Sequence, residues 1–237
     1  MAFELTPQEQ TVRDKAVAYA NANKKRIAKE IVDSFDAETE PVSVFMAGSP
    51  GAGKTEVSKA FIEALGGSTL RIDNDELRER FEDYEGFNSP LFQDAATRLV
   101  EAIHDCALKR RVSFILDTTL ANLAKASQNI ERSIRRKRTV LVLFVYQRPE
   151  VAWQFVKARE KAEGRRVPPE VFIEQFIGAR ETVNTLKQTF GRDIELTVLV
   201  KDIKGEIERF YDNVDSVDAV IKEKYNRESL AEIVCKG

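Results

Sequence analysis

The stretch that decides the fold is Gly48-Ser49-Pro50-Gly51-Ala52-Gly53-Lys54-Thr55. It matches the pattern G-x-x-x-x-G-K-[ST], with an apolar run directly before it and an amphipathic stretch directly after it, as this pattern requires. Its glycines let the backbone curl so that successive N–H groups point at phosphate oxygens, and the following helix presents its positive N-terminal end to the same anion. The sequence therefore predicts a loop that binds the phosphates of a nucleotide.

The last two residues of this loop are predicted to carry its chemistry. Lys54 supplies a mobile positive charge for the β- and γ-phosphates, and the Thr55 hydroxyl is placed to ligate Mg²⁺. GTPases with such a phosphate-binding loop usually carry Asp-x-x-Gly after one strand and Asn/Thr-Lys-x-Asp after a later strand. Here Asp117-Thr118-Thr119-Leu120 lacks the glycine and Lys201-Asp202 lacks the second pattern. We therefore expect ATP and Mg²⁺ rather than a GTP switch.

Short apolar runs alternate with helical stretches along the rest of the chain. The expected strands are Val42–Ala47, Thr69–Asp73, Val112–Asp117, Thr139–Tyr146 and Ile194–Val200, and the clearest helices between them are Lys54–Leu65, Leu91–Lys109 and Pro169–Phe190. This alternation predicts an α/β protein with the three-layer P-loop kinase fold and a mostly parallel five-stranded sheet. The continuous apolar run Val140–Val145 is expected to be a central strand, and residues 193–213 could add an antiparallel edge strand.

We expect one domain over residues 1–237, because no repeat, low-complexity tract or flexible linker interrupts the chain. Thr6-Pro7-Gln8-Glu9 has the form of a capping box with proline at the first helical position, which predicts a helical extension over residues 1–36. The apolar stripe of this helix predicts packing against the sheet. A docking surface for a partner protein is the alternative.

The composition excludes several classes of protein. Hydrophobic residues make up 43% of the 237 residues, and Lys+Arg 37 against Asp+Glu 39 give a net charge of −2, which is typical of globular proteins. Cys106 and Cys235 lie far apart, which excludes a disulfide scaffold and a structural zinc site. The sequence shows no basic-then-apolar leader and no apolar run of membrane-spanning length. We therefore expect a cytoplasmic protein without membrane contact.

Acidic residues follow two of the expected strands. Asp73 ends the second strand and Asp75 follows two residues later, and the carboxyl ends of strands border the ligand crevice in an open α/β sheet. One of these carboxylates could orient an acceptor hydroxyl and take its proton, although capping the next helix is the alternative for one of them. Asp117 ends the third strand and could hold Mg²⁺ directly or through water, with Thr118 or Thr119 contacting substrate.

A basic segment suits a lid over the nucleotide. Residues 148–170 contain Arg159, Arg165 and Arg166 and run through Gly164 to a helix that proline begins. Arginines of such a lid neutralise charge on the transferring phosphoryl group while the closed lid excludes water. For each arginine, a solvated surface charge is the alternative.

The remaining charged and aromatic signals point to structure. A second basic run, residues 132–138, could indicate nucleic-acid binding, but the net charge is slightly negative and cations are favoured at helix C-termini. We therefore do not expect nucleic acid as a partner. His104, the only histidine, and Trp153 are predicted to pack in the core.

The order of these motifs resembles the zeta toxin family. The resemblance extends from about Val42 to Asn213 and is carried by Gly48–Thr55, Ile72-Asp73-Asn74-Asp75, Arg78, Asp117-Thr118-Thr119, Arg165-Arg166 and Tyr211-Asp212-Asn213. It implies a P-loop kinase of a toxin–antitoxin system that phosphorylates UDP-N-acetylglucosamine on a sugar hydroxyl. It also implies a partner antitoxin, which in some members of the family blocks the nucleotide site.

The resemblance further implies roles for individual residues. Asp75 corresponds to the family's catalytic base, Lys54 to its phosphate lysine, and Arg159 and Arg165 to its two phosphate-clamping arginines. Asp73 and Arg78 are expected to contact substrate.

Two further positions resemble substrate contacts of the family. Glu101 resembles an acid and Thr119 resembles a threonine that contact the substrate. The family's Glu-Gly-Thr is Asp117-Thr118-Thr119 here and the segment between the two arginines is shorter, so the choice between Arg165 and Arg166 stays open.

We accordingly expect an ATP-dependent kinase whose acceptor is the hydroxyl of a small metabolite, with a nucleotide sugar first. A polynucleotide or nucleoside kinase is one alternative, which the second basic run would favour. The other is a nucleotide-binding regulatory or interaction module that does not transfer phosphate.

Overall fold

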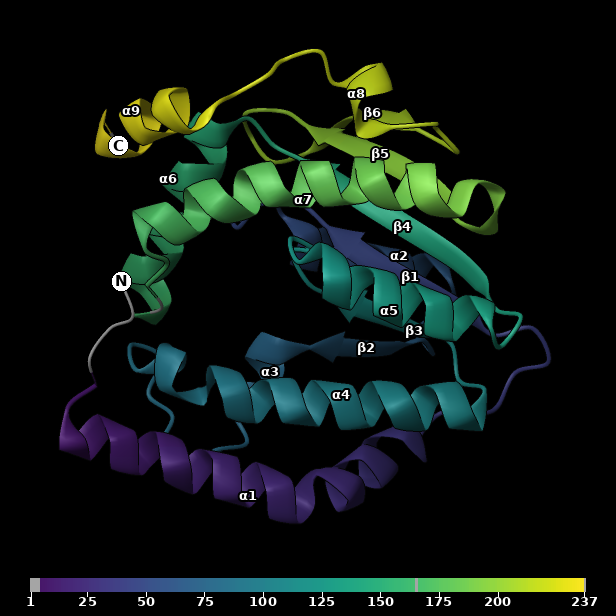
Figure 1. The fold of residues 1–237 in the computed structure, drawn as a ribbon, viewed down its shortest axis with the longest axis vertical. Helices are drawn as coiled ribbons and strands as arrows, with labels where there is room; N and C mark the ends of the chain where they lie inside the picture. Colours follow the sequence, from purple (N-terminus) through teal and green to yellow (C-terminus); the bar gives the residue numbers. More distant parts are fainter. Residues whose placement is uncertain (1–4, 165, 237) are drawn as a thin grey trace.

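The computed structural model describes residues 5–164 and 166–236, which form one mixed sheet between two layers of helices (Figure 1). The strands are β1 (Val42–Ala47), β2 (Leu70–Asp73), β3 (Phe114–Asp117), β4 (Thr139–Tyr146), β5 (Glu195–Lys201) and β6 (Ile207–Tyr211). They lie in the order β2-β3-β1-β4-β5-β6. The first five are parallel and β6 is antiparallel to β5. The expected sheet is confirmed, with its antiparallel edge strand.

Both faces of the central strands are buried. In β1, Phe45 and Ala47 belong to a large apolar cluster, whereas Val44 and Met46 belong to a smaller one. Successive side chains of a strand point to opposite faces, so the two clusters lie on opposite sides of the sheet. β4 pairs with β1 on one side and β5 on the other, which confirms the prediction of a central strand from its continuous apolar run.

The helices divide between the two faces. The large cluster includes side chains of α4 (Gln93–Arg110), α5 (Leu123–Ile134) and α7 (Pro169–Phe190), and these three helices lie together in front of the sheet in Figure 1. The small cluster is covered by α2 (Lys54–Ala64). The other elements are α3 (Asn74–Arg78), α6 (Pro149–Glu163), α8 (Val217–Val220), α9 (Arg227–Lys236) and the 3₁₀ turns η1 (Ser89–Phe92) and η2 (Gly191–Asp193).

The N-terminal helix α1 (Pro7–Val32) does not pack on the sheet, so that expectation was wrong. Its buried residues face α4, and α1 lies beyond α4 on the side away from the strands (Figure 1). The reason is that α4 itself already covers this face of the sheet with Leu99 and Ile103. The predicted capping box is present, because the Thr6 hydroxyl accepts from Glu9 N and the Glu9 carboxylate accepts from Thr6 N.

Two elements begin two residues later than the sequence prediction. β3 begins at Phe114 rather than Val112, because the N–H and hydroxyl of Ser113 donate to the Glu38 carboxylate, at 3.0 and 2.7 Å. The helix expected from Leu91 begins at Gln93, after a 3₁₀ turn that contains Pro90. No helix in the described part of the chain is long and apolar enough to cross a membrane.

His104 and Trp153 are buried, as predicted. The His104 ring packs edge-on against Phe45 and Phe114. Burial lowers the pKa of His104 to about 3, and the nearby cations Arg132, Arg138, Arg136 and Lys125 act in the same direction. The imidazole is therefore neutral in the folded protein at neutral pH.

This depressed pKa predicts a specific pH dependence of stability. An unfolded chain protonates His104 near pH 6.5, whereas the folded chain does not until about pH 3. The contribution of neutral His104 is therefore present above pH 6.5 and is lost as the pH falls toward 3. Between pH 7.5 and 5 we expect the free energy of unfolding to fall by roughly 2 kcal/mol more in wild type than in His104→Gln. Urea denaturation at both pH values measures this, and parallel pH curves for the two proteins would contradict it.

Candidate nucleotide-binding site

Several of the predicted site residues meet at one edge of the sheet. Asp73, the last residue of β2, is in register with Asp117, the last residue of β3. β1 runs parallel to β3 and leads into the glycine-rich loop, where Gly48 N donates to Thr119 O at 3.2 Å. The carboxyl ends of the strands thus bring the loop, the two acids and Thr119 together, which is where an open α/β sheet binds ligands.

The glycine-rich loop has the backbone shape that its sequence predicts. Gly48, Gly51 and Gly53 all have positive φ, and Gly53 with φ 82° begins α2. The Lys54 ammonium donates back to the carbonyl oxygens of Gly48 at 3.0 Å and Ser49 at 2.8 Å. The lysine charge therefore lies over the loop at the positive end of α2, where an anion would bind.

Helix α6 lies directly on this loop. A Cβ atom at Gly51 would lie 2.1 Å from Ala152 O in α6, so no side chain fits between the loop and the helix. At its other end α6 reaches the segment after α3, because a Cβ at Gly86 would lie 2.5 Å from Glu163 O. The helix therefore bridges the phosphate-binding loop and the segment after β2.

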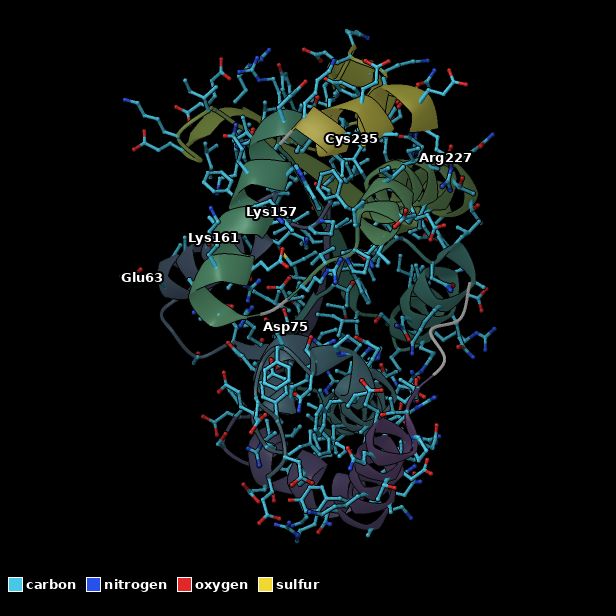
Figure 2. The ribbon with its side chains drawn as sticks, turned by 90° about the vertical axis from the view of Figure 1, so that its left-hand side faces the viewer. Glu63, Asp75, Lys157, Lys161, Arg227 and Cys235 are labelled. Carbon is cyan, nitrogen blue, oxygen red and sulfur yellow. The ribbon has the colours of Figure 1, made fainter. Side chains whose placement is uncertain are left out.

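The bridging helix brings an arginine to Asp75. Arg159 in α6 lies with Nη2 3.8 Å from Asp75 Oδ2, and Figure 2 shows Asp75 beside the end of α6 that carries Lys157 and Lys161. The same guanidinium also contacts Glu163 at 2.7 Å. Of the two predicted lid arginines, Arg159 is therefore placed next to the predicted base.

Arg78 and Asp73 also hold Asp75 in place. Arg78, whose side chain is 6% exposed, donates from Nη1 to Asp75 Oδ1 at 2.9 Å. The Asp75 backbone N–H donates to Asp73 Oδ1 at 2.8 Å, which makes Asp73 the N-cap of α3. One of the acids is therefore a helix cap, as expected, and Asp75 keeps a partly exposed carboxylate.

Sequence reasoning missed the residue that organises the two strand-end acids. Arg71 in β2 has an 8% exposed side chain, and its guanidinium contacts Asp73, Glu76 and, at 2.6 Å, Asp117. Its Nε also donates to Ser58 Oγ in α2 at 2.9 Å. An arginine between the apolar residues Leu70 and Ile72 of a buried strand was the available signal. We call Arg71 and these four partners the Arg71 cluster.

The Arg71 cluster sets the electrostatics of this edge. Burial raises the pKa of the Asp73 carboxyl, and the charges of Asp75 and Asp117 raise it further, while Arg71 acts to lower it. Three carboxylates close together repel one another. A buried guanidinium between two of them offsets that repulsion and fixes where they point.

The predicted metal ligands fit a hard cation. Thr55 is the second residue of α2, and Asp117 Oδ2 lies 3.1 Å from Ser58 Oγ one turn further along that helix. Hydroxyl and carboxylate oxygens are ligands that Mg²⁺ prefers, and Mg²⁺ usually takes few protein ligands besides phosphates. The described residues contain no group of three or more His, Cys, Asp or Glu that could hold a metal alone.

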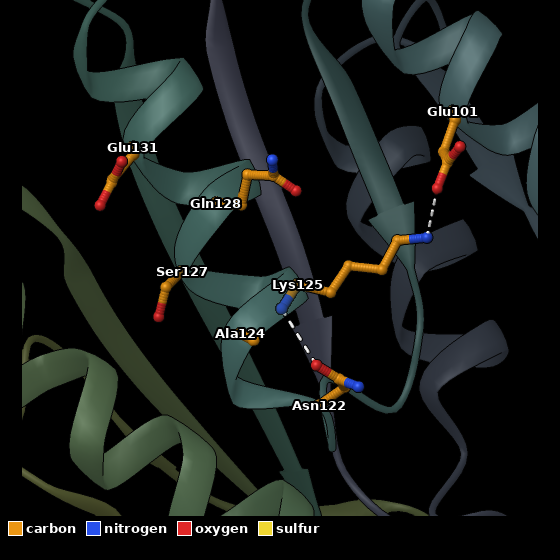
Figure 3. A pocket seen from close by; sticks show the side chains of 7 residues that line it. All are labelled: Glu101, Asn122, Ala124, Lys125, Ser127, Gln128 and Glu131. Carbon is orange, nitrogen blue, oxygen red and sulfur yellow. Dashed lines mark hydrogen bonds and ion pairs between the residues drawn. The ribbon is translucent and has the colours of Figure 1, made fainter.

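Glu101 belongs to α4, and its side chain lies beside α5 rather than at the strand ends. It lines an open cavity of about 530 Å³ with Asn122, Lys125, Gln128 and Glu131 among the other residues (Figure 3). Its carboxylate is paired with the Lys125 ammonium at 2.6 Å. A substrate that contacted Glu101 would have to share it with Lys125.

The structure describes only one of the two candidates for the second lid arginine. Arg165 lies outside the described residues, so its predicted role stays a prediction. Arg166 is 70% exposed and lies 4.0 Å from Glu160.

The second basic run lies away from the phosphate-binding loop. It precedes β4, at the edge of the sheet opposite the carboxyl ends of the parallel strands. Arg138 is buried, and its guanidinium donates to Ser43 Oγ and to the carbonyl oxygens of Val42 and Val112. Arg132 in α5 is paired with Asp105 of α4, and Arg135 with Glu131 one turn earlier in its own helix. Arg138 therefore stabilises the fold, whereas Arg135, Arg136 and Lys137 are exposed.

Fold and loop together define a P-loop kinase-like protein. A family model described as Zeta toxin matches residues 24–215, and the chain belongs to the zeta toxin family. The resemblance seen in the sequence is confirmed. A search of curated proteins gave no match.

Solved structures show the same fold. A chain from the PezAT chromosomal toxin-antitoxin system of Streptococcus pneumoniae superposes with a TM-score of 0.66 at 14% identity, covering 98% of this chain and 95% of that one. The AvrRxo1-ORF1:AvrRxo1-ORF2 complex with sulphate ions gives 0.58 at 15% identity, covering 89% and 68%. A chain of the Pnkp1/Rnl/Hen1 RNA repair complex gives 0.51 at 17%, covering 81% and 54%. The family and the fold support an ATP-using phosphotransferase.

The Arg71 cluster predicts a large loss of stability when the arginine is removed. Arg71→Met leaves Asp73 and Asp117 buried without their cation, so we expect the free energy of unfolding to fall by roughly 3 to 5 kcal/mol. Arg80→Met is the matched control, since Arg80 is more exposed and lies 3.5 Å from Glu30, and it should cost no more than about 1 kcal/mol. Chemical denaturation compares the two. Equal stability of Arg71→Met and wild type would show that Arg71 does not hold the acids.

Proposed function

We propose that this protein transfers the γ-phosphate of ATP to a hydroxyl group of a small metabolite, with a nucleotide sugar such as UDP-N-acetylglucosamine as the first candidate. One observation carries the proposal: Asp75 is held between Arg78 and Arg159 beneath a helix that lies on the phosphate-binding loop. This arrangement supports the proposal, because one helix contacts the phosphate-binding loop at Ala152 and, two turns further on, the Asp75 carboxylate through Arg159. The AvrRxo1-ORF1:-ORF2 complex, which has a related fold, has a structure with ATP.

The proposed reaction uses residues from three elements. The backbone N–H groups of residues 48–55 and the Lys54 ammonium bind the β- and γ-phosphates. Asp75 accepts the proton of the acceptor hydroxyl while that oxygen bonds to the γ-phosphorus and the bond from phosphorus to the bridging oxygen of ADP breaks. Arg159 stabilises the negative charge on the transferring group, and Arg165 is proposed to help it.

Other residues are proposed to position these groups. Arg78 and Asp73 orient Asp75 through the contacts described above, so Arg78 acts through Asp75 as well as toward substrate. Thr55 and Asp117 would hold Mg²⁺, which neutralises phosphate charge when bound. Helix α6 covers the loop and excludes water, which would otherwise compete as acceptor.

The acceptor is proposed to lie beside Asp75, toward Thr119 and Glu101. Glu101 and the polar cavity between α4 and α5 offer hydrogen-bonding groups of the kind that sugars need. The chain has Asp117-Thr118-Thr119 where the family resemblance leads us to expect Glu-Gly-Thr. This difference favours a pocket that departs in detail from the family's sugar site.

An antitoxin is proposed as protein partner. The family and the toxin-antitoxin system among the structural relatives support it. The apolar stripe of α1 is occupied by α4, so a partner that contacts α1 would use its exposed polar face.

A transfer assay tests the proposed function. Wild type is incubated with ATP, Mg²⁺ and a panel of nucleotide sugars, nucleosides and oligonucleotides, and mass spectrometry detects an added phosphate. We expect phosphate on a nucleotide sugar, and a loss of at least about a hundredfold in kcat for Asp75→Asn with ATP affinity retained. Asp36→Asn, at an exposed acid that precedes β1 whereas the loop follows it, is the matched control and should behave as wild type.

Other outcomes separate the alternatives. Phosphate on an oligonucleotide or nucleoside would support the polynucleotide or nucleoside kinase instead. ATP consumed only into water across the whole panel would contradict the proposal. If Lys54→Ala abolished the biological effect while Asp75→Asn left it intact, the protein would be a regulatory module.

Arg159 predicts a defect in the chemical step. Arg159→Gln removes the cation that faces Asp75, so we expect kcat to fall by roughly a hundredfold or more while the KM for ATP changes much less. Arg135→Gln, at an exposed arginine on the opposite edge of the sheet, should leave both constants unchanged. A variant whose KM rises with kcat unchanged would place Arg159 in nucleotide binding alone.

A further inference from the structure

Two lysines are buried to nearly the same extent but differ in their partners. Lys187 in α7 is 9% exposed, and its ammonium donates to the carbonyl oxygens of Gly191 at 3.0 Å and Ile194 at 2.8 Å. Lys201, the last residue of β5, is 8% exposed. Within residues 5–164 and 166–236, no group accepts a hydrogen bond from the Lys201 ammonium or forms an ion pair with it. A largely buried cation without a protein partner is unfavourable, and the Lys201 nitrogen is not itself sealed from solvent, so water or an anion can reach it.

The Lys201 side chain points at the phosphate-binding loop. A Cβ atom at Gly53 would lie 2.2 Å from Lys201 Nζ, 3.1 Å from its Cε and 3.2 Å from its Cδ. The end of the lysine therefore runs along Gly53, where glycine alone leaves room for it. Gly53 is the N-cap of α2, an eleven-residue helix, so the ammonium lies beside the positive end of that helix and one residue from Lys54.

Neighbouring contacts hold Lys201 in this place. Gln147 Nε2 donates to Asp202 O at 2.7 Å, which ties the end of β5 to the end of β4. The Asp202 carboxylate accepts from the backbone N–H groups of Lys204 at 2.8 Å and Glu206 at 2.9 Å. The carboxylate of Asp202, the residue after Lys201, is thus hydrogen-bonded to the backbone of its own turn and does not pair with the Lys201 ammonium.

We propose that Lys201 is a second phosphate-binding lysine, whose ammonium pairs with the polyphosphate of the bound nucleotide. The inference rests on the proposed function, because it takes a nucleoside polyphosphate to be the ligand of the loop. The Lys201 ammonium beside Gly53, the Lys54 ammonium on the carbonyl oxygens of Gly48 and Ser49, and the N-terminus of α2 favour an anion with several negative charges. A phosphate oxygen would accept a charge-assisted hydrogen bond from the Lys201 ammonium. Carbonyl oxygens of the protein already accept such bonds from Lys187.

Equilibrium binding tests this role without the transfer reaction. The dissociation constants of ADP and adenosine are measured by calorimetry for wild type, Lys201→Met and Lys187→Met. We expect Lys201→Met to weaken ADP binding roughly ten- to a hundredfold and to leave adenosine binding unchanged. Lys187→Met, the matched loss of a buried lysine, should leave both constants unchanged.

Stability provides the second measurement. Because no described group loses a partner, Lys201→Met should be at least as stable as wild type without nucleotide, whereas Lys187→Met should be less stable. Lys201→Gln, which keeps a polar side chain without the charge, should weaken ADP binding as Lys201→Met does.

Several results would overturn the inference. They are equal ADP affinity in wild type and both Lys201 variants, an equal loss for adenosine and ADP, or Lys201 variants that fail to fold. Wild type that binds no ADP or ATP would instead contradict the proposed function itself.

Discussion

The structure depends on the close contact between helix α6 and the phosphate-binding loop. Gly51 is the residue that permits it, because a side chain there would collide with the backbone of Ala152. This contact fixes the direction in which α6 leaves the sheet. As a result Arg159, two turns along the helix, lies at Asp75, and the end of the helix reaches Gly86. Two parts of the site that are far apart in sequence are thereby joined by one helix.

Charge balance is the second constraint on the site. Three acids, Asp73, Asp75 and Asp117, lie at the edge where a polyphosphate would add further negative charge. Arg71 is committed to Asp73 and Asp117, and Arg78 to Asp75. These buried cations let the acids keep fixed positions. Lys54, Lys201 and Arg159, together with Arg165, are the cations proposed to bind the phosphate chain.

The sequence predicted the fold well because the decisive signals were local. The glycine-rich loop between a strand and a helix, the capping box at Thr6 and the continuous apolar run of β4 each report on neighbouring residues. The packing of α1 was predicted wrongly, because an apolar stripe shows that a helix is covered but not by which element. The edge strand was predicted only as a possibility, since β6 is short and exposed.

The site was predicted only in part, because local sequence signals do not show which distant elements come into contact. Asp73 and Asp117 could be predicted from their positions at strand ends, since parallel strands bring their carboxyl ends to one edge. No role could be predicted for Arg71 or Lys201, because each depends on a contact with a residue distant in sequence. Arg71 contacts Asp117, and Lys201 lies beside Gly53. Arg165 lies outside the described residues, and its role stays a prediction.

A crystal structure with Mg²⁺ and a non-hydrolysable ATP analogue would show whether Lys54, Arg159 and Asp75 meet at one phosphate. We expect a terminal phosphate within hydrogen-bond distance of the Lys54 ammonium and the Arg159 guanidinium. The Asp75 carboxylate should then lie roughly 6 Å from the γ-phosphorus, which leaves room for one acceptor hydroxyl between them. A terminal phosphate that points away from Asp75, with Arg159 in solvent, would contradict the account.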